Sequence, residues 1–203
     1  MKRRTQSAFT LMELMVVLSI ASVILMIAIP NVQSFIKNNR MTGAANDLLT
    51  SFALARNEAI KRQVPVAVCA STNPKTATPD CATGTFASWI VFVDTNNNGL
   101  HDAGEDVISA HDPLDPVIST GADNAYIVSY AATGFAQTAP GGRAATTQVA
   151  MCDDRHNTAT MGSSQLSAAR AVTINATGRA RVTRIVAEIG AVIGNIGAFG
   201  NCT

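Results

Sequence analysis

The sequence predicts an α+β fold in which one long N-terminal helix packs on an antiparallel β-sheet domain. Three observations predict it. Residues 9–29 are almost all apolar, residues 41–59 carry apolar side chains at helical spacing, and the remainder consists of short Val/Ile/Thr-rich runs separated by turn residues. With 47% hydrophobic and 14% charged residues among 203, the chain is too apolar for a disordered protein. Because only one long apolar run occurs, a multi-pass membrane protein is also excluded.

The first element is a predicted transmembrane helix over residues 9–29. At 1.5 Å per residue this segment rises about 31 Å, enough to cross a bilayer core. Lys2, Arg3 and Arg4 precede it, so the N-terminus is expected in the cytoplasm and the C-terminal part outside. A secretory signal peptide is the alternative. The run is longer than a signal core, however, and no Ala-x-Ala site follows it before the next helix.

Glu13 is a carboxylate inside this apolar run. A charge there costs about 2.5–3.5 kcal/mol, so it needs a partner or a position at the interface, where it can snorkel. A cut between Ala8 and Phe9 would create a new amine four residues before Glu13. A neighbouring subunit could then use that amine to neutralise the carboxylate.

The stretch FTLMELMVV, residues 9–17, resembles the class III signal of type IV pilins and type II secretion pseudopilins. This resemblance implies that a prepilin peptidase cuts after Ala8 and methylates the new amine of Phe9. It also implies that Glu13 aligns the subunit during assembly with other pilins or pseudopilins, from the inner membrane into a filament. Ala8 departs from the family pattern, which usually has Gly at this position.

The helix is expected to continue beyond the apolar run. Pro30 predicts a kink or a local loosening, and the family resemblance implies that the helix resumes after it. Apolar residues then recur at spacings of 4, 3, 4, 3 and 4, which predicts one buried stripe of Met41, Ala45, Leu48, Phe52, Ala55 and Ala59. The expected division is a leader (1–8), a transmembrane helix (9–29), an amphipathic continuation (30–62) and a periplasmic or extracellular β-rich domain (63–203).

Seven short runs in the last segment are predicted strands, because they are rich in Val, Ile and Thr and lie between turn residues. They are residues 66–70, 88–93, 106–110, 126–131, 148–152, 170–175 and 179–186. Two segments, 71–85 and 133–147, are predicted loops. The glycine-rich tail 190–200 is expected to pack on the sheet or close it, because each interior Gly costs about 1 kcal/mol of helix and argues against a second membrane span.

The four cysteines are expected to form disulfides, because all lie in the predicted external part, where disulfides persist. Three pairings are possible. Cys69 with Cys81 would close the loop between them, and Cys152 with Cys202 would tie the C-terminal tail to the sheet. A zinc site is the alternative, but no C-x-x-C occurs and the three histidines are scattered.

Residues 94–105 match the twelve-residue calcium-loop pattern D-x-[DN]-x-[DN]-G-x5-E. Strand-like runs flank them, whereas an EF-hand has helices. A hairpin turn, with positive φ supplied at Asn98-Gly99, is therefore favoured over calcium binding. A similar stretch forms a hairpin in the GspH/FimT branch of pilin-like proteins. The residues that would bind calcium are Asp94, Asn96, Asn98, Leu100, Asp102 and Glu105.

Residues 175–178 read as a turn that leads into the last strand. On a regular strand, Arg179 and Arg181 would face the same side, about 7 Å apart. Two guanidiniums at this spacing match successive phosphates along a nucleic-acid strand. The alternative is a solvated strand end whose arginines pair with Asp153 or Asp154.

Residues 178–181, GRAR, resemble the G-R-x-R motif of FimT, a minor type IV pilin that binds DNA in natural transformation. The resemblance assigns contacts with DNA phosphates to Arg179 and Arg181, and the shaping of the loop to Gly178. It makes Arg184 an accessory contact, although on a regular strand that side chain would point to the other side unless a bulge intervenes.

Charge is unevenly distributed along the chain, whose net charge is +1. Residues 41–142 carry a net −6, and residues 143–203 a net +3 from six arginines and three acids. A basic end of this kind raises the question of a polyanionic partner. No G-x-S-x-G elbow, P-loop or other ordered catalytic motif occurs, so neither an enzyme nor a cofactor is expected. Three functions remain: a DNA-binding minor pilin, a structural secretion pseudopilin, and a minor pilin that primes assembly.

Overall fold

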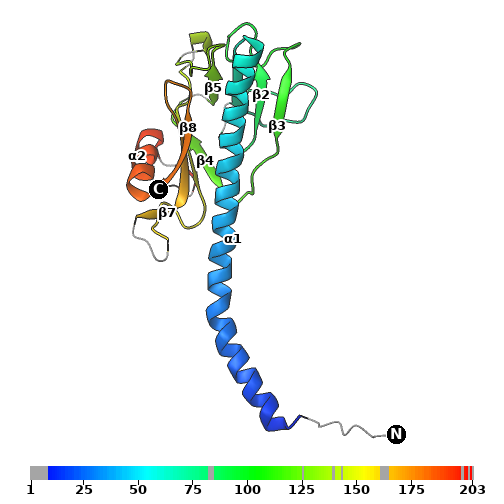
Figure 1. Cartoon of the computed structure of the whole chain (residues 1–203), viewed down its shortest axis with the longest axis vertical. Helices are drawn as coiled ribbons and strands as arrows, with labels where there is room; N and C mark the ends of the chain where they lie inside the picture. Colours follow the sequence, from blue (N-terminus) through cyan, green and yellow to red (C-terminus); the bar gives the residue numbers. More distant parts are fainter. Residues whose placement is uncertain are drawn as a thin grey trace, which may run out of the picture. The chain divides into compact units, whose positions relative to one another are not determined.

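The structure, a computed structural model, describes residues 9–81, 85–124, 126–138, 140–142, 144–160, 165–197, 199–200 and 202. It divides into two compact units, residues 1–39 and 40–203, and helix α1 (Leu11–Arg62) contributes to both. The other elements in chain order are drawn in Figure 1. They are β1 (Val66–Ala70), β2 (Trp89–Val93), β3 (Val107–His111), β4 (Ser119–Ala122), β5 (Ile127–Tyr130), η1 (Pro140–Gly142), β6 (Gln148–Cys152), β7 (Leu166–Ile174), β8 (Ala180–Ile185) and α2 (Val186–Ile196).

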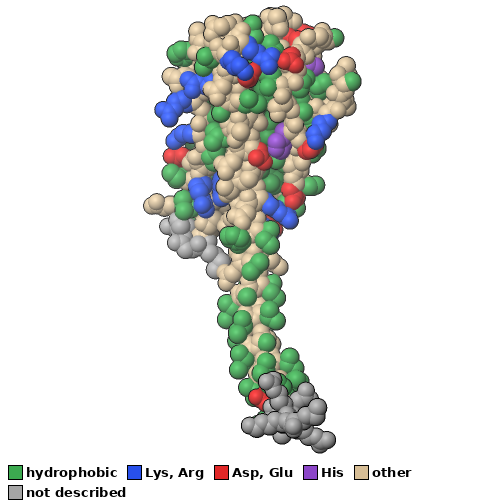
Figure 2. All heavy atoms as spheres, turned by 45° about the vertical axis from the view of Figure 1, so that its right-hand side comes forward, with side chains coloured by type: hydrophobic (Ala, Val, Ile, Leu, Met, Phe, Trp, Pro, Cys, Tyr) green, Lys and Arg blue, Asp and Glu red, His purple; other side chains and the backbone are tan. Residues whose placement is uncertain are grey.

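The first unit consists of the apolar part of α1, whose large side chains are exposed to solvent. Figure 2 shows hydrophobic side chains over the visible face of this segment. Among the described residues, α1 is the one helix with an 18-residue window apolar enough to cross a membrane, and its mean hydropathy there is 2.6. The expectation that residues 9–29 span a membrane therefore rests on the length and composition of this part of α1.

The helix continues through Pro30. Proline lacks the N–H that would donate to the carbonyl four residues earlier, so the helix loses one backbone hydrogen bond here. Two polar side chains donate to neighbouring carbonyls of the helix. Asn31 Nδ2 donates to the carbonyl of Ile27 at 3.0 Å, and Ser34 Oγ donates to that of Pro30 at 3.2 Å. The expectation that the helix resumes beyond Pro30 is confirmed.

In the second unit, the predicted apolar stripe of α1 is buried. Its six predicted residues are all inaccessible to solvent or nearly so, and Ala44 joins them. They pack against residues of both sheets, including Val68 of β1, Val149 of β6 and Trp89 of β2. The helix is amphipathic here because one face contributes to the main core of the domain.

The strands form two antiparallel sheets, where the sequence predicted one undivided β-domain. One sheet has the order β3-β2-β1-β5 and the other β4-β6-β7-β8. All seven predicted strands occur. Six agree within one residue at each end, β7 begins four residues earlier than predicted, and β4 was not predicted. The tail also differs from expectation, because residues 186–196 form α2.

Helix α2 covers the face of sheet β4-β6-β7-β8 that lies away from the main core. Ile189 and Val192 pack there against small residues of β6 and β7. The Cys152–Cys202 disulfide, with Cα atoms 5.5 Å apart, joins the end of β6 to the C-terminal tail. The tail therefore packs on the sheet, as predicted, and it does so as a helix.

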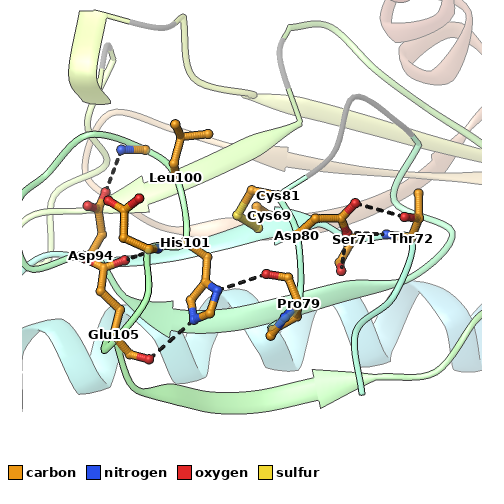
Figure 3. The surroundings of a disulfide bond; sticks show 12 residues. Cys69, Ser71, Thr72, Pro79, Asp80, Cys81, Asp94, Leu100, His101 and Glu105 are labelled. Carbon is orange, nitrogen blue, oxygen red and sulfur yellow. Dashed lines mark hydrogen bonds between the residues drawn. A yellow bond between two sulfur atoms is a disulfide. The ribbon is translucent and has the colours of Figure 1, made fainter. Parts of the chain in front are cut away.

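Loops cover the outer face of the other sheet (Figure 3). Cys69 of β1 is bonded to Cys81, and the Cα atoms are 5.4 Å apart. The His101 ring packs edge-on against Phe92, and its Nδ1 lies 2.9 Å from the carbonyl oxygen of Pro79. The loop around Cys81 and the loop after β2 thus pack together, which explains why β1 and β2 are buried on both faces.

Candidate nucleic-acid interface

The predicted turn at residues 175–178 joins β7 to β8, which pair in antiparallel register. The Gly178 N–H donates to the Asn175 carbonyl at 2.9 Å, and the Asn175 side-chain oxygen accepts from the Arg179 N–H at 2.9 Å. Gly178 has a φ of 77°, a conformation that side chains with a β-carbon rarely adopt. The turn therefore depends on an Asn and a Gly at these two positions.

Arg56 of α1 donates hydrogen bonds to this turn and to the loop beside it. Its Nε donates to the Gly134 carbonyl at 3.0 Å, and its Nη2 donates to the Thr177 carbonyl at 3.2 Å. A β-carbon on Gly178 would collide with the Gly134 carbonyl oxygen. Sequence reasoning did not identify Arg56, because a contact with Thr177, 121 residues away, leaves no local pattern.

Arg179 and Arg181 project from the same, solvent-exposed side of the chain. Ala180 and Val182, which alternate with them, contact the main core, so the two arginines point outward. The Arg181 side chain is 69% exposed. The predicted pair is thus available to a large partner.

Three shallow hollows follow one another along β8 and share these arginines. Arg179 lines the first with residues of α1, Arg179 and Arg181 line the second, and Arg181 lines the third with residues of α2. A polyanion lying along β8 would meet both guanidiniums in succession.

Two neighbours restrain Arg181. Its Nε donates to Thr173 Oγ1 on β7 at 3.2 Å, and its Nη2 lies 3.7 Å from a carboxylate oxygen of Glu188. That carboxylate also accepts from Thr183 Oγ1 at 2.5 Å. Glu188 belongs to the unpredicted helix α2, so sequence reasoning missed this partly neutralising neighbour.

Arg184 does not join the predicted pair. It is half-buried, and its Nε is buried without a hydrogen-bond partner. It lies close enough to Arg170 for the two positive charges to repel. Of the two acids in the alternative pairing, Asp153 binds Arg155, with Nε–O distances of 3.0 and 3.1 Å.

The assembly residues lie in the first unit, apart from Ala8 and the rest of the expected leader, which are outside the described residues. Phe9 is 78% exposed and precedes α1. Glu13 lies in the first helical turn, where its N–H donates to Thr10 Oγ1 at 3.2 Å. Thr10 and Glu13 thus stand at the spacing of a helix N-terminal capping box.

The loop at 94–105 connects the antiparallel strands β2 and β3, as the hairpin interpretation requires. Gly99 has a φ of 73°, as predicted, but Asn98 does not have a positive φ; the other positive values in the loop belong to Asn97 and Gly104. Buried Asp94 accepts from the N–H groups of Asn98 and Gly99 at 3.0 and 2.9 Å.

The other acidic groups of this loop also bind donors within the loop. Asp102 accepts from the amides of Asn96 and Asn98 at 2.8 and 2.6 Å, and Glu105 accepts from the Thr95 and Asp102 N–H groups. The Leu100 N–H donates to Asn98. Over the described ranges, no three His, Cys, Asp or Glu side chains are grouped to hold a metal ion. The hydrogen bonds account for the shape of the loop.

Two solved structures resemble this chain. Both are crystal forms of the type IV minor pilin FimU from Pseudomonas aeruginosa strain PAO1. One is 17% identical, covers 73% of this chain and 92% of its own, and has a TM-score of 0.48. The other is 16% identical, covers 70% and 91%, and has a TM-score of 0.45. Among curated proteins, no significant match is found.

Two family profiles match the sequence. The prokaryotic N-terminal methylation motif matches residues 3–29, which confirms the resemblance of the N-terminal segment to pilin signals. The family described as type II transport protein GspH matches residues 44–178, well over half of the chain. The chain therefore belongs to the GspH family of pilin-like proteins.

Proposed function

We propose that this protein is a minor type IV pilin that binds the phosphate backbone of DNA through Arg179 and Arg181 during uptake. The observation that carries the proposal is the outward projection of both arginines from β8, beside hollows that follow the strand. A guanidinium presents a planar fork of donors that suits phosphate oxygens. Gly178 and Arg56 would position the pair without touching the DNA.

In this proposal the N-terminal segment serves processing and assembly. A prepilin peptidase cuts between Ala8 and Phe9 and methylates the new amine, and Glu13 pairs with the amine of a neighbouring subunit. Residues 9–29 anchor the chain in the inner membrane before assembly, with the β-rich domain on the periplasmic side. Partners of the mature protein are then other pilin-like subunits and DNA.

Binding through two phosphate contacts would be weak and independent of sequence, because no side chain of the pair reads base edges. Backbone contacts of this kind give dissociation constants of about 10⁻⁴–10⁻⁶ M at physiological salt. Glu188 would lower the affinity further by competing for Arg181. Several subunits along a filament would compensate for weak single sites.

The test is a titration of labelled duplex DNA with the full chain in zwitterionic lipid nanodiscs. Binding by wild type and its loss in Arg179→Gln/Arg181→Gln would support the proposal. An unaltered affinity in that double variant would overturn it.

A second candidate is a structural pseudopilin of a type II secretion system. The observation that favours it is the family profile, whose description is a type II transport protein. A minor pilin that primes pilus assembly is the third reading of the same N-terminal motif. All three readings require Glu13 for filament formation, but these two predict no DNA binding. A chain that assembles into filaments and does not bind DNA in the titration would therefore favour them.

A further inference from the structure

Arg184, which the G-R-x-R resemblance makes an accessory DNA contact, lies apart from Arg179 and Arg181 on β8. Strand β8 pairs regularly with β7 from Ala180 to Thr183, and then the register shifts before Ile185 meets Leu166. Arg184 lies at this irregularity, beside the extra residues of β7. It is therefore separated from the exposed pair at the start of β8.

Arg170 occupies the same irregularity on β7 and is 3% exposed. One terminal nitrogen, Nη1, donates to the carbonyls of Ser167, Ala168 and Ala169 at 2.9–3.0 Å. The other, Nη2, donates to Thr42 Oγ1 on α1 at 3.3 Å. Arg170 thus satisfies carbonyls that the bulge removes from the ladder, and it is a structural cation with no carboxylate partner among these contacts.

The carboxylate that acts on Arg170 is already paired with another arginine. Asp153 is buried close to Arg170, but its carboxylate binds Arg155 through Nε and Nη2. Within the part of the chain that the structure describes, neither Arg170 nor Arg184 forms an ion pair, and the buried Arg184 Nε has no hydrogen-bond partner. The charges that act on Arg170 are thus those of two other arginines, Arg184 and Arg155, and of one carboxylate that Arg155 already binds.

The surroundings already disfavour this excess of positive charge. Burial lowers the pKa of the Arg170 guanidinium to about 10, and the charges of Arg184 and Arg155 act in the same direction. A buried Nε without an acceptor adds the cost of a desolvated donor. An incoming anion would offset the repulsion between these positive charges.

We propose that Arg184, backed by Arg170, forms a binding site for a single oxyanion group, either a carboxylate or a phosphate. Arg184 is half-buried, so part of the residue reaches solvent, and buried Arg170 supplies a fixed positive charge nearby. Both ligand groups match the guanidinium fork. In a filament, an acidic side chain of a neighbouring pilin-like subunit would supply the carboxylate, whereas free phosphate would come from solution.

The site is independent of the DNA-binding proposal. Arg179 and Arg181 are exposed and lie along the open side of β8, whereas Arg184 is partly enclosed at the bulge. An extended polyanion would follow the exposed pair, and a single oxyanion group would suit the enclosed one. The two functions can therefore be removed separately by substitution.

The test compares thermal unfolding of the oxidised full chain in nanodiscs, in a variant set built on Arg179→Gln/Arg181→Gln to remove the DNA-binding pair. Two probes distinguish the sources: inorganic phosphate, and N-acetyl-glutamate α-amide, whose one ionisable group is a side-chain carboxylate. Sodium chloride at equal ionic strength is the reference. Further variants are Arg184→Gln, Arg184→Lys and, as a matched exposed control, Lys75→Gln.

A ligand that binds only the folded state raises the melting temperature. At probe concentrations well above the dissociation constant, we expect a rise of about 2–4 °C over the chloride reference for a domain of this size. The rise should persist in Lys75→Gln, shrink in Arg184→Lys and vanish in Arg184→Gln. A rise with phosphate alone or with the blocked glutamate alone supports the site and identifies its source. An equal rise in all variants, or none in any, overturns the proposal.

Discussion

Gly178 and Gly134 approach so closely that a β-carbon on Gly178 would overlap the Gly134 carbonyl oxygen. Gly134 lies in the loop after β5, whereas Gly178 ends the turn before β8, so the contact joins the two sheets. Arg56 binds the same carbonyl and completes the arrangement. Gly178, the glycine of the G-R-x-R stretch, is therefore required by tertiary packing as well as by the positive φ of the backbone at this position.

Gly178→Ala should lower the free energy of unfolding by about 2–4 kcal/mol, because a left-handed backbone and a steric collision both oppose the new methyl group. Gly142→Ala is the matched control. Gly142 has nearly the same φ, 78°, but open space around the position of a β-carbon, so it should lose only about 1–2 kcal/mol. Denaturant unfolding of both variants checks this, and equal losses would show that the collision is relieved at no cost.

Arg56→Lys should loosen the turn while it keeps the positive charge. An ammonium cannot reproduce the two bonds to the carbonyls of Gly134 and Thr177, whose donors are Nε and Nη2 of one planar fork. Hydrogen exchange should accelerate over residues 175–179 and remain unchanged in β6. Lys61→Gln, an exposed change on the same helix, should leave both regions as in wild type. Unchanged protection of the turn in Arg56→Lys would contradict the role given to the fork.

Glu188→Gln should strengthen DNA binding two- to fivefold, about the value of one exposed ion pair, because it removes the carboxylate that competes for Arg181. Asp112→Asn makes the same change in net charge on a residue that pairs with Lys75. DNA titrations of the two variants side by side separate a local effect from a general one. If Asp112→Asn has the same effect as Glu188→Gln, the gain reflects net charge alone.

Removal of the two disulfides should have unequal effects. In the chain-entropy account, a bridge over 12 residues contributes about 3 kcal/mol and one over 50 residues about 4 kcal/mol. Cys152→Ser/Cys202→Ser should therefore destabilise the domain more than Cys69→Ser/Cys81→Ser, and it should also expose α2 to proteolysis. Denaturant unfolding and limited proteolysis under oxidising conditions measure both. A larger loss for the short bridge would favour local packing over chain entropy.

Acid should weaken the domain partly through Glu58. Hydrogen bonds from Arg62 and Lys61 lower the pKa of its carboxyl below the ordinary value. Because the folded pKa is below the unfolded one, the stabilisation is present above about pH 4.3 and is lost as pH falls through the folded pKa. Melting curves from pH 6 to pH 3 should fall less steeply for Glu58→Gln than for wild type. Parallel curves would assign the acid sensitivity to other carboxyls.

Sequence reasoning succeeded where a local pattern decides the structure. The apolar stripe of α1 follows from spacing alone, and Met41, Leu48 and Phe52 are all fully buried. The antiparallel strands likewise follow from composition and turn residues. Strand alternation likewise predicts that Arg179 and Arg181 share one side, and the core contacts of Ala180 and Val182 identify that side as the outward one.

Sequence reasoning failed where tertiary contacts outweigh local preference. Strand β4 contains Gly121, which reads as a turn residue, but a β-carbon there would strike the Phe199 ring. Helix α2 contains Gly190 and lacks a side-chain cap at its N-terminus. It forms because Ile189 packs on the sheet, a long-range contribution that propensity cannot register.

The central claim is that Arg179 and Arg181 hold DNA phosphates. The most direct measurement is the affinity of the full chain, in zwitterionic nanodiscs, for labelled duplex DNA at 50 and 200 mM salt. Wild type should bind weakly, and two phosphate contacts should make its affinity fall about tenfold between these salt concentrations.

The charge-matched pair of variants decides the outcome. Arg179→Gln/Arg181→Gln should abolish binding at both salt concentrations, whereas Lys61→Gln/Lys75→Gln, which removes two exposed positive charges elsewhere, should retain it. Equal weakening in the two double variants, or no binding by folded and oxidised wild type, would contradict the claim.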